Sequence, residues 1–222
     1  MGKKFNIATA LIVTILPWQT ALAQSNDFSI SGDITGVSDY RFRGVSMTSK
    51  DPAIQGTLKV EHSSGFYVTA WGSNISDFNG ADVEVDFMAG YVFSLGNDVS
   101  VDIGVMEYVY PGGTGTNYFE TYAFVAVPVE IGELSLGVNY TPSQNNIGGT
   151  DNIYLSAGYS VPIFDTGFTG SAYFAYEDGA FGNNKTDWAL GLSYDFERFT
   201  IDGKYIDTNL GNGAGGATGS LD

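Results

Sequence analysis

Acidic side chains recur at every second position in several stretches of this sequence. Glu84 and Asp86, for example, alternate with the apolar residues Val83, Val85 and Phe87. Successive side chains of a strand point to opposite faces, so this pattern gathers carboxylates on one face and apolar groups on the other. Carboxylates that line a passage favour cations over anions. By alternation, eight acids and two bases share the polar face: Asp33, Lys59, Glu61, Glu84, Asp86, Asp102, Glu120, Asp195, Asp202 and Lys204.

The basic residues leave two alternatives open. Arg41 and Arg43 lie in a long connection, 39–52, where they could fold inward as a constriction or pair with acids of their own loop. We expect loop anchoring for both. Lys59 and Lys204 could stand among carboxylates that line an open or gated pore, or pair with neighbouring acids in a salt-bridged plug. We expect the pore.

Signals for catalysis are poor, and we predict neither an enzyme nor a bound cofactor. The single histidine, His62, precedes Ser63 and Ser64, but neighbours on a tight turn rarely reach the geometry of a nucleophile and its base. Ca²⁺ binding by loop acids is an alternative, yet the D-x-D-x-D-G pattern is absent. We predict ordinary solvated acids and no metal site for Asp27, Asp77, Asp82, Asp151, Glu177 and Asp178.

Composition narrows the class of protein further. The chain has no cysteine, 14% aromatic residues and a net charge of −16. Such an acidic chain is a poor partner for nucleic acid, because phosphate binding needs a basic surface. The aromatic content argues against disorder. Residues 24–222 are enough for one domain.

The N-terminus is typical of a secretory signal peptide. Lys3 and Lys4 precede an apolar run, 5–18, and residues 21–23 give the small-residue A-x-A pattern for cleavage. The apolar run is shorter than the ~20 residues that a spanning helix needs. We predict a signal peptide at 1–23 and a mature protein that begins at Gln24.

Period-two alternation runs through almost all of the remaining chain and predicts about eleven strands. Their connections alternate between short and long, as in outer-membrane barrels with short periplasmic turns and long extracellular loops. The expected long connections are 39–52, 74–82, 110–116, 141–151 and 178–186. The expected strands are 27–38, 53–62, 66–74, 83–93, 98–109, 117–127, 133–141, 152–161, 168–177, 187–196 and 199–207.

The two faces of these strands point to a transmembrane up-and-down β-barrel. The apolar face carries aromatic residues towards strand ends, as in the girdles at membrane interfaces, whereas the other face is small and polar. Barrels of this kind have an even number of strands. Since a Gly-rich tail, 208–222, follows the eleventh, we expect it to be an extracellular loop and the native barrel to have a twelfth strand that this chain lacks.

Several segments resemble the TorF-type porins, a family of bacterial outer-membrane barrels. The resemblance is carried by Asp39 to Ser46, Pro52 to Gly56, Ser64 to Ser73 and Glu84 to Tyr91. It is dense over 28–93 and weaker to about 207, and it implies location in the outer membrane of a Gram-negative bacterium, among lipid and lipopolysaccharide. The transported substrate and the oligomeric state stay open.

Three functions fit these observations. The first, which we expect, is a narrow porin for passive diffusion of small hydrophilic solutes, with a preference for cations. The second is a non-conducting structural or interaction barrel whose acidic loops contact surfaces or partners. The third is a soluble periplasmic β-sandwich.

Overall fold

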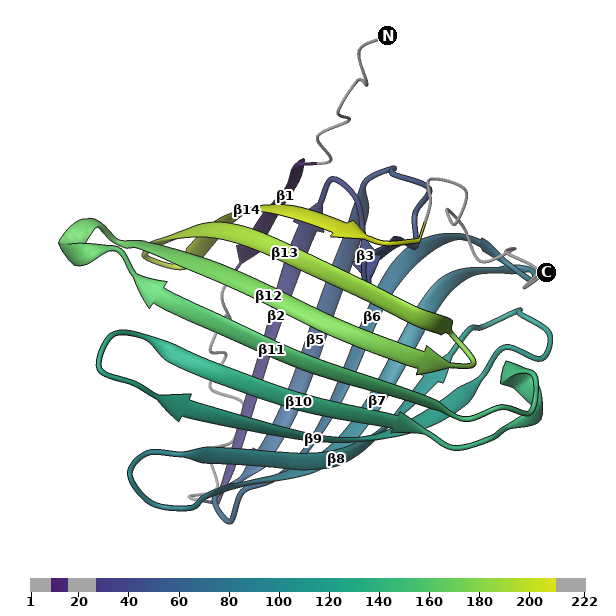
Figure 1. Cartoon of the computed structure of the whole chain (residues 1–222), viewed down its shortest axis with the longest axis horizontal. Coiled ribbons are helices and arrows are strands. Elements are labelled where there is room, and N and C mark those ends of the chain that lie inside the picture. Colours follow the sequence, from purple (N-terminus) through teal and green to yellow (C-terminus); the bar gives the residue numbers. More distant parts are fainter. Residues whose placement is uncertain (1–8, 16–26, 211–222) are drawn as a thin grey trace, which may run out of the picture.

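Strands make up nearly all of the regular structure in the computed structural model, which describes residues 9–15 and 27–210 (Figure 1). The elements, in chain order, are β1 (Thr9–Ile15), β2 (Phe28–Val37), β3 (Arg41–Phe42), β4 (Val45–Ser46), β5 (Ala53–His62), β6 (Phe66–Phe78), β7 (Ala81–Ser94), β8 (Ser100–Val109), β9 (Tyr118–Pro128), β10 (Glu133–Thr141), η1 (Asn145–Ile147), β11 (Asn152–Pro162), η2 (Phe164–Thr166), β12 (Phe168–Gly179), β13 (Gly182–Phe196) and β14 (Phe199–Thr208). Within these described ranges, the structure has no helix long and apolar enough to cross a membrane.

The eleven long strands β2 and β5 to β14 form one antiparallel sheet in which each strand pairs with its neighbours in the sequence. β1 pairs with both β14 and β2, and its place between them closes the sheet into a barrel. The expected all-β antiparallel fold is therefore confirmed, and a two-sheet sandwich is not what the chain forms. β1 lies within the predicted signal peptide, whose cleavage site falls outside the described residues, as does most of the tail 208–222.

Two of the expected long connections are tight turns instead. β6 and β7 continue to Phe78 and from Ala81, so that Asn79 and Gly80 alone join them, both at positive φ (51° and 96°). Positive φ at both central residues gives the twist that a two-residue hairpin needs. β12 and β13 likewise extend towards each other as far as Gly179 and Gly182. The polar residues near these turns resemble loop sequence because they lie on strands that have a polar inner face.

The barrel buries polar groups and exposes apolar ones. Leu58, Phe87 and Leu190 point outward from three different strands and are 52–60% exposed, whereas Glu84 and Glu120 are fully buried. The inner face is not only small and polar as expected. Tyrosines line much of it, and Tyr67, Tyr108, Tyr118, Tyr122 and Tyr154 are all buried.

Candidate functional site

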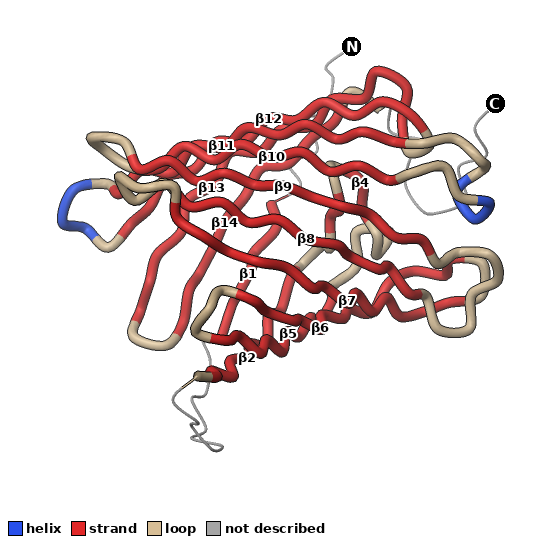
Figure 2. The backbone as a smooth tube through the Cα atoms, turned by 90° about the horizontal axis from the view of Figure 1, so that it is seen from below, coloured by secondary structure: helices blue, strands red, loops and turns tan. Residues whose placement is uncertain are grey.

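The connection between β2 and β5 enters the barrel as a short hairpin. β3 and β4 pair with each other, with Arg41 opposite Ser46, and form a separate two-stranded sheet that lies within the ring of strands (Figure 2). Arg43 and Gly44 form the tip, both at positive φ (47° and 84°). We call residues 38–52 the inner hairpin.

Hydrogen bonds within the inner hairpin fix its shape. Ser46 Oγ donates to Asp39 Oδ1 at 2.5 Å, and the Tyr40 amide donates to Thr48 Oγ1 at 3.1 Å. Arg41 Nε lies 2.8 Å from Asp39 Oδ2, and its Nη1 donates to the Gly44 carbonyl at 3.1 Å. Arg41 thus pairs within its own loop, in the anchoring role expected for it.

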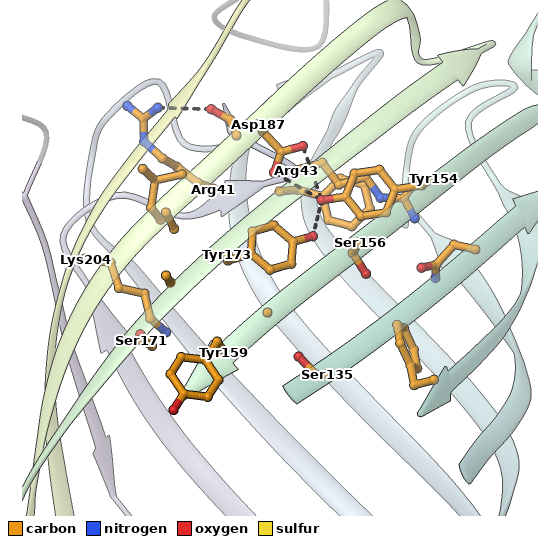
Figure 3. A pocket seen from close by; sticks show the side chains of 18 of the residues that line it. Arg41, Arg43, Ser135, Tyr154, Ser156, Tyr159, Ser171, Tyr173, Asp187 and Lys204 are labelled. Carbon is orange, nitrogen blue, oxygen red and sulfur yellow. Dashed lines mark hydrogen bonds between the residues drawn. The ribbon is translucent and has the colours of Figure 1, made fainter. Parts of the chain in front are cut away.

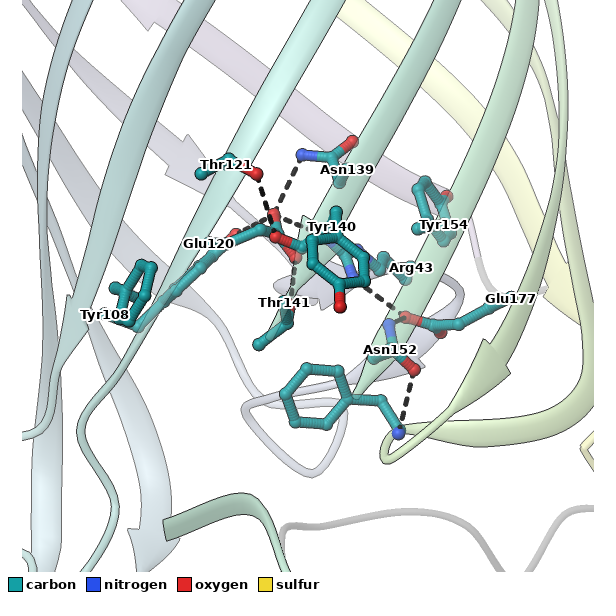
Figure 4. Close-up of polar contacts among 12 residues, drawn as sticks. Arg43, Tyr108, Glu120, Thr121, Asn139, Tyr140, Thr141, Asn152, Tyr154 and Glu177 are labelled. Atoms are coloured by element: carbon teal, nitrogen blue, oxygen red, sulfur yellow. Dashed lines mark hydrogen bonds and ion pairs between the residues drawn. The ribbon is translucent and has the colours of Figure 1, made fainter. Parts of the chain in front are cut away.

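Arg43 does not follow the same expectation, because its guanidinium group crosses the lumen to two other strands. Its Nη2 lies 2.8 Å from both carboxylate oxygens of Glu120 on β9, and its Nη1 lies 2.8 Å from Glu177 Oε1 on β12 (Figure 4). The Arg43 side chain is 7% exposed and both glutamates are 0% exposed. The guanidinium carbon also lies 4.3 Å from the centroid of the Tyr154 ring. We call Arg43, Glu120 and Glu177 the clamp.

Further donors satisfy the carboxylates of the clamp. Glu120 accepts hydrogen bonds from Asn139 Nδ2 and Thr141 Oγ1, each at 2.8 Å. Glu177 accepts one from Asn152 Nδ2 at 3.0 Å and pairs with Lys185 Nζ. Burial opposes the charge of Arg43, but the carboxylates, Glu120 foremost, outweigh it and hold the Arg43 pKa well above its usual value. A buried ion pair is stable when its remaining lone pairs are satisfied in this way.

An aromatic cluster fills the lumen beside the clamp, at the end where the long connections lie. Its buried members are Ile75, Ala81, Tyr108, Tyr110 and Tyr118. Side chains of the inner hairpin, Tyr40, Phe42 and Met47, pack against this cluster. The hairpin and the cluster together therefore occupy this end of the barrel.

Beyond the inner hairpin the lumen opens into a cavity of about 580 Å³ (Figure 3). On one side Tyr154 OH donates to Asp187 Oδ1 at 3.1 Å and shares a hydrogen bond with Tyr173 OH. Serine hydroxyls and basic groups share the rest of the lining with apolar side chains such as Phe42, Met106, Phe124 and Ile206; the polar groups include Ser135, Ser156, Ser160, Ser171, Arg41, Arg43 and Lys204. The cavity is therefore amphipathic, with polar groups that can hydrogen-bond to water or a small polar solute.

The residues predicted for the polar face fall into three groups. Glu84, Asp86 and Glu120 are buried near the inner hairpin. Asp102 lies further along the barrel and accepts from Tyr67 OH at 2.9 Å. The others are half-buried or exposed. Lys59 pairs with Glu61 at 2.5 Å, Lys204 with Asp202 at 2.7 Å, and Asp33 and Asp195 accept hydrogen bonds from Thr35 and Thr200.

Sequence reasoning missed three charged residues of the site. Glu177 was expected to be a solvated loop acid, but it is fully buried in the clamp. Lys185 fell inside an expected loop, and Asp187 was read only as the first residue of a strand. The signal that could have found them is the alternation of Ser193, Gly191 and Ala189 on β13, which continues back through both residues.

His62 and Ser64 come close together but lack the surroundings of a catalytic pair. His62 Nδ1 lies 2.7 Å from Ser64 Oγ and also accepts the Ser64 amide at 3.1 Å. Among the described residues no carboxylate hydrogen-bonds to the ring, which makes a T-shaped contact with the Phe28 ring. These contacts shape a solvent-exposed turn. The described residues also contain no cluster of three His, Cys, Asp or Glu side chains that could hold a metal ion.

The fold and site define an antiparallel β-barrel with an apolar exterior and a charged, partly filled interior. The chain belongs to the Gcw_chp family, described as bacterial proteins of unknown function, whose model matches residues 21–219. No curated protein matches it. Among solved structures, it is similar to OccAB4 of Acinetobacter baumannii, with 11% identity and a TM-score of 0.39. That match covers 83% of this chain and 63% of the OccAB4 chain.

Proposed function

We propose that this protein is a porin-like channel in the outer membrane of a Gram-negative bacterium. Small hydrophilic solutes diffuse through its lumen, cations are preferred, and the inner hairpin forms the constriction. The observation that carries this proposal is the inverted distribution of side chains, with apolar groups outside and charged groups inside. Water would solvate such an exterior poorly, but the hydrocarbon of a bilayer matches it.

The dimensions of the barrel support a place in the membrane. A transmembrane β-strand needs about 9–11 residues. Strands β2 and β5 to β14 have 9 to 15 residues, with β10 the shortest and β13 the longest. The predicted signal peptide would supply export, and the resemblance to TorF-type porins points to the same location. The acidic connections would then face lipopolysaccharide and its bridging ions.

The route for solutes follows from the contents of the lumen. Solutes would enter the cavity from the short-turn end and meet the clamp at Arg43. Passage beyond that point requires the inner hairpin to move, because its side chains and the aromatic cluster fill the lumen there. We therefore propose a narrow or gated pore rather than a wide one.

A second function, a non-conducting barrel, is favoured by the same filled lumen. Conductance of the purified, folded protein in planar bilayers separates the two. Single-channel steps would support the channel, and Arg43→Ala should enlarge them. If neither the wild type nor Arg43→Ala gave steps at any voltage, the channel proposal would fall, and the interaction barrel would remain.

A further inference from the structure

Glu84 and Asp86 are two buried acids whose charge has no counterpart among the described side chains. They lie two residues apart on β7, are 0% and 6% exposed, and are both turned towards the lumen by alternation. Glu84 Oε2 and Asp86 Oδ1 are buried without any hydrogen-bond partner among the described residues. Two of the described basic residues, Lys50 and Arg198, are exposed. The others form ion pairs with other acids, namely Asp39, Glu61, Glu120, Glu177 and Asp202.

Tyrosine side chains surround the pair and link it to two connections of the barrel. Tyr110 OH donates to Glu84 Oε1 at 2.7 Å, and Tyr40 also hydrogen-bonds to Glu84. Tyr40 belongs to the inner hairpin, and Tyr110 belongs to the connection between β8 and β9. Tyr108 on β8 lies opposite Asp86. Glu84 therefore joins the inner hairpin to the barrel wall.

Within the described part of the chain, the other elements around the pair bring no free positive charge to it. Glu120 on β9 is a further acid near Asp86, and Arg43 is already paired with Glu120 at 2.8 Å. Tyr118 on β9 is uncharged, as is Trp71 on β6, which lies opposite Asp86. Burial without a cation penalises an ionised carboxylate, whereas a protonated carboxyl group is neutral and can donate a hydrogen bond. These surroundings therefore favour the protonated form of the pair.

We propose that Glu84 and Asp86 form a proton switch that holds the inner hairpin against β7 while they are protonated and releases it when they ionise. Loss of the protons to water leaves two negative charges roughly 7 Å apart along one strand. These charges repel each other and must be hydrated. The inner hairpin and the aromatic cluster fill the lumen beside them, so hydration requires the hairpin to withdraw. The lumen is therefore closed at low pH and open at high pH.

The switch deepens the proposed channel function, and its effect on conduction rests on that function. The titration of the pair does not, because it changes the stability of the barrel whether or not solutes pass. In the unfolded chain both acids are exposed and are ionised at neutral pH. The folded chain then binds more protons than the unfolded chain, so its stability should fall as the pH rises.

The test follows the contact between Trp71 and Tyr40, whose ring centroids lie 5.3 Å apart. The full chain, folded in detergent, carries Trp18→Phe and Trp188→Phe, so that Trp71 is its single tryptophan. Its emission is followed from about pH 5 to about pH 9, where exposed carboxyl groups are ionised and tyrosine is still protonated. We expect a reversible shift to longer wavelength as the pH rises, because water replaces Tyr40 beside the indole ring. The midpoint of thermal unfolding should fall over the same range.

The double variant Glu84→Gln/Asp86→Asn, made in the same single-tryptophan chain, mimics the protonated pair, since its amides are neutral and keep the shape of the carboxyl groups. It should hold the inner hairpin in place and abolish both responses to pH. The matched control Asp77→Asn/Asp82→Asn removes two exposed acids and should keep both responses. The proposal would be wrong if the wild-type pair gave no change in emission, or if the double variant kept the full change.

Single variants keep the proposal testable if the double variant fails to fold. Glu84→Gln and Asp86→Asn each remove one of two like charges, so the remaining acid ionises more readily. The change in Trp71 emission should therefore move to lower pH in both. An unmoved change in both single variants would overturn the switch.

Conductance in planar bilayers separates the switch from the channel. Wild-type protein should conduct severalfold more at about pH 9 than at about pH 5, and the double variant should conduct equally at both. A wild-type conductance that is the same at both pH values would overturn the switch as a control of the pore. If the protein never conducted but its emission changed as expected, the channel proposal would fall and the switch would stand.

Discussion

Arg43 lies 2.8 Å from both carboxylate oxygens of Glu120, although 77 positions separate the two residues in the sequence. The contact joins the tip of the inner hairpin to the wall of the barrel at β9. Glu177 extends the contact to β12, so that one guanidinium ties a loop to two strands. The clamp therefore holds the tip of the inner hairpin against the barrel wall, while Tyr40, Phe42 and Met47 pack on the cluster beside it.

Removal of the guanidinium should loosen the inner hairpin and widen the constriction. Arg43→Ala leaves Glu120 buried without its cation, and the loss of one partner from a buried ion pair costs about 3–5 kcal/mol. We expect a lower unfolding midpoint and a severalfold higher single-channel conductance. Arg41→Ala is the control, because Arg41 pairs only within its loop. Equal conductance of the two variants would argue against the clamp as the constriction.

Outward and inward positions should respond differently to arginine. Leu190 and Leu136 point outward and are 60% and 46% exposed, whereas Ser193 and Ser135 lie on the inner face. An arginine at the middle of a bilayer costs about 2–4 kcal/mol on the lipid face of a barrel. Leu190→Arg and Leu136→Arg should therefore impair membrane assembly more than Ser193→Arg and Ser135→Arg, as measured by the fraction of heat-modifiable protein.

Gly137 is not a suitable inward control, although sequence alternation places it on the inner face. A Cβ atom at this position would meet both the Phe124 ring and Ser156 Oγ at 2.5 Å. Any side chain there must displace a neighbour, so Gly137→Arg should impair assembly for steric reasons.

The comparison of Leu190→Arg with Ser193→Arg tests the orientation of the strands. Equal assembly of these two variants would contradict an apolar face towards the lipid and a polar face towards the lumen.

Cation preference should depend most on the acids without a basic partner. At a pH high enough to ionise both carboxyl groups, Glu84→Gln/Asp86→Asn should move the reversal potential in a KCl gradient towards zero, because an ionised carboxylate without a basic partner attracts cations into a narrow passage. Glu120 contributes less, since Arg43 compensates its charge. The difference between wild type and variant should shrink in concentrated salt, where the Debye length falls from about 10 Å at 0.1 M to about 3 Å at 1 M. An unchanged reversal potential would mean that the acidic loops, and not Glu84 and Asp86, determine the cation preference.

Asp102 offers a distance control for the same measurement. It lies opposite Val92, six residues along β7 from Asp86, or roughly 20 Å at ~3.3 Å per residue. Asp102→Asn should therefore change the reversal potential less than the double variant does, and the two effects should add. A larger effect of Asp102→Asn would mean that the part of the lumen around Asp102, and not the part around Glu84 and Asp86, determines the preference for cations.

The N-terminus of protein isolated from membranes should be Gln24. The A-x-A pattern at 21–23 and the short apolar run before it predict cleavage there. Cleavage would remove β1 and leave β14 and β2 without the backbone pairs they form with Thr9–Ile15. Intact-mass spectrometry measures this directly. A mass that still includes residues 9–15 would show that β1 belongs to the mature barrel.

The pattern of alternation was sufficient to predict the eleven long strands, β2 and β5 to β14, but not β1, β3 or β4. Period two is a local property, so each strand can be recognised without knowledge of its partners. The predicted 133–141 coincides with β10, and the predicted 53–62 coincides with β5. The prediction of long loops at 74–82 and 178–186 was wrong, because both segments are strand ends joined by tight turns. Polar residues near a strand end have the same sequence pattern whether they face a water-filled lumen or belong to a loop.

The clamp was decided by the tertiary structure alone. Arg43, Glu120 and Glu177 lie on three segments separated by 77 and 57 positions, and no local pattern relates them. Sequence reasoning treated Arg43 like Arg41, since both are loop arginines near loop acids. Only the closed sheet brings β9 and β12 to face the inner hairpin across one lumen, and the low exposure of that lumen makes the pairing of their charges energetically necessary.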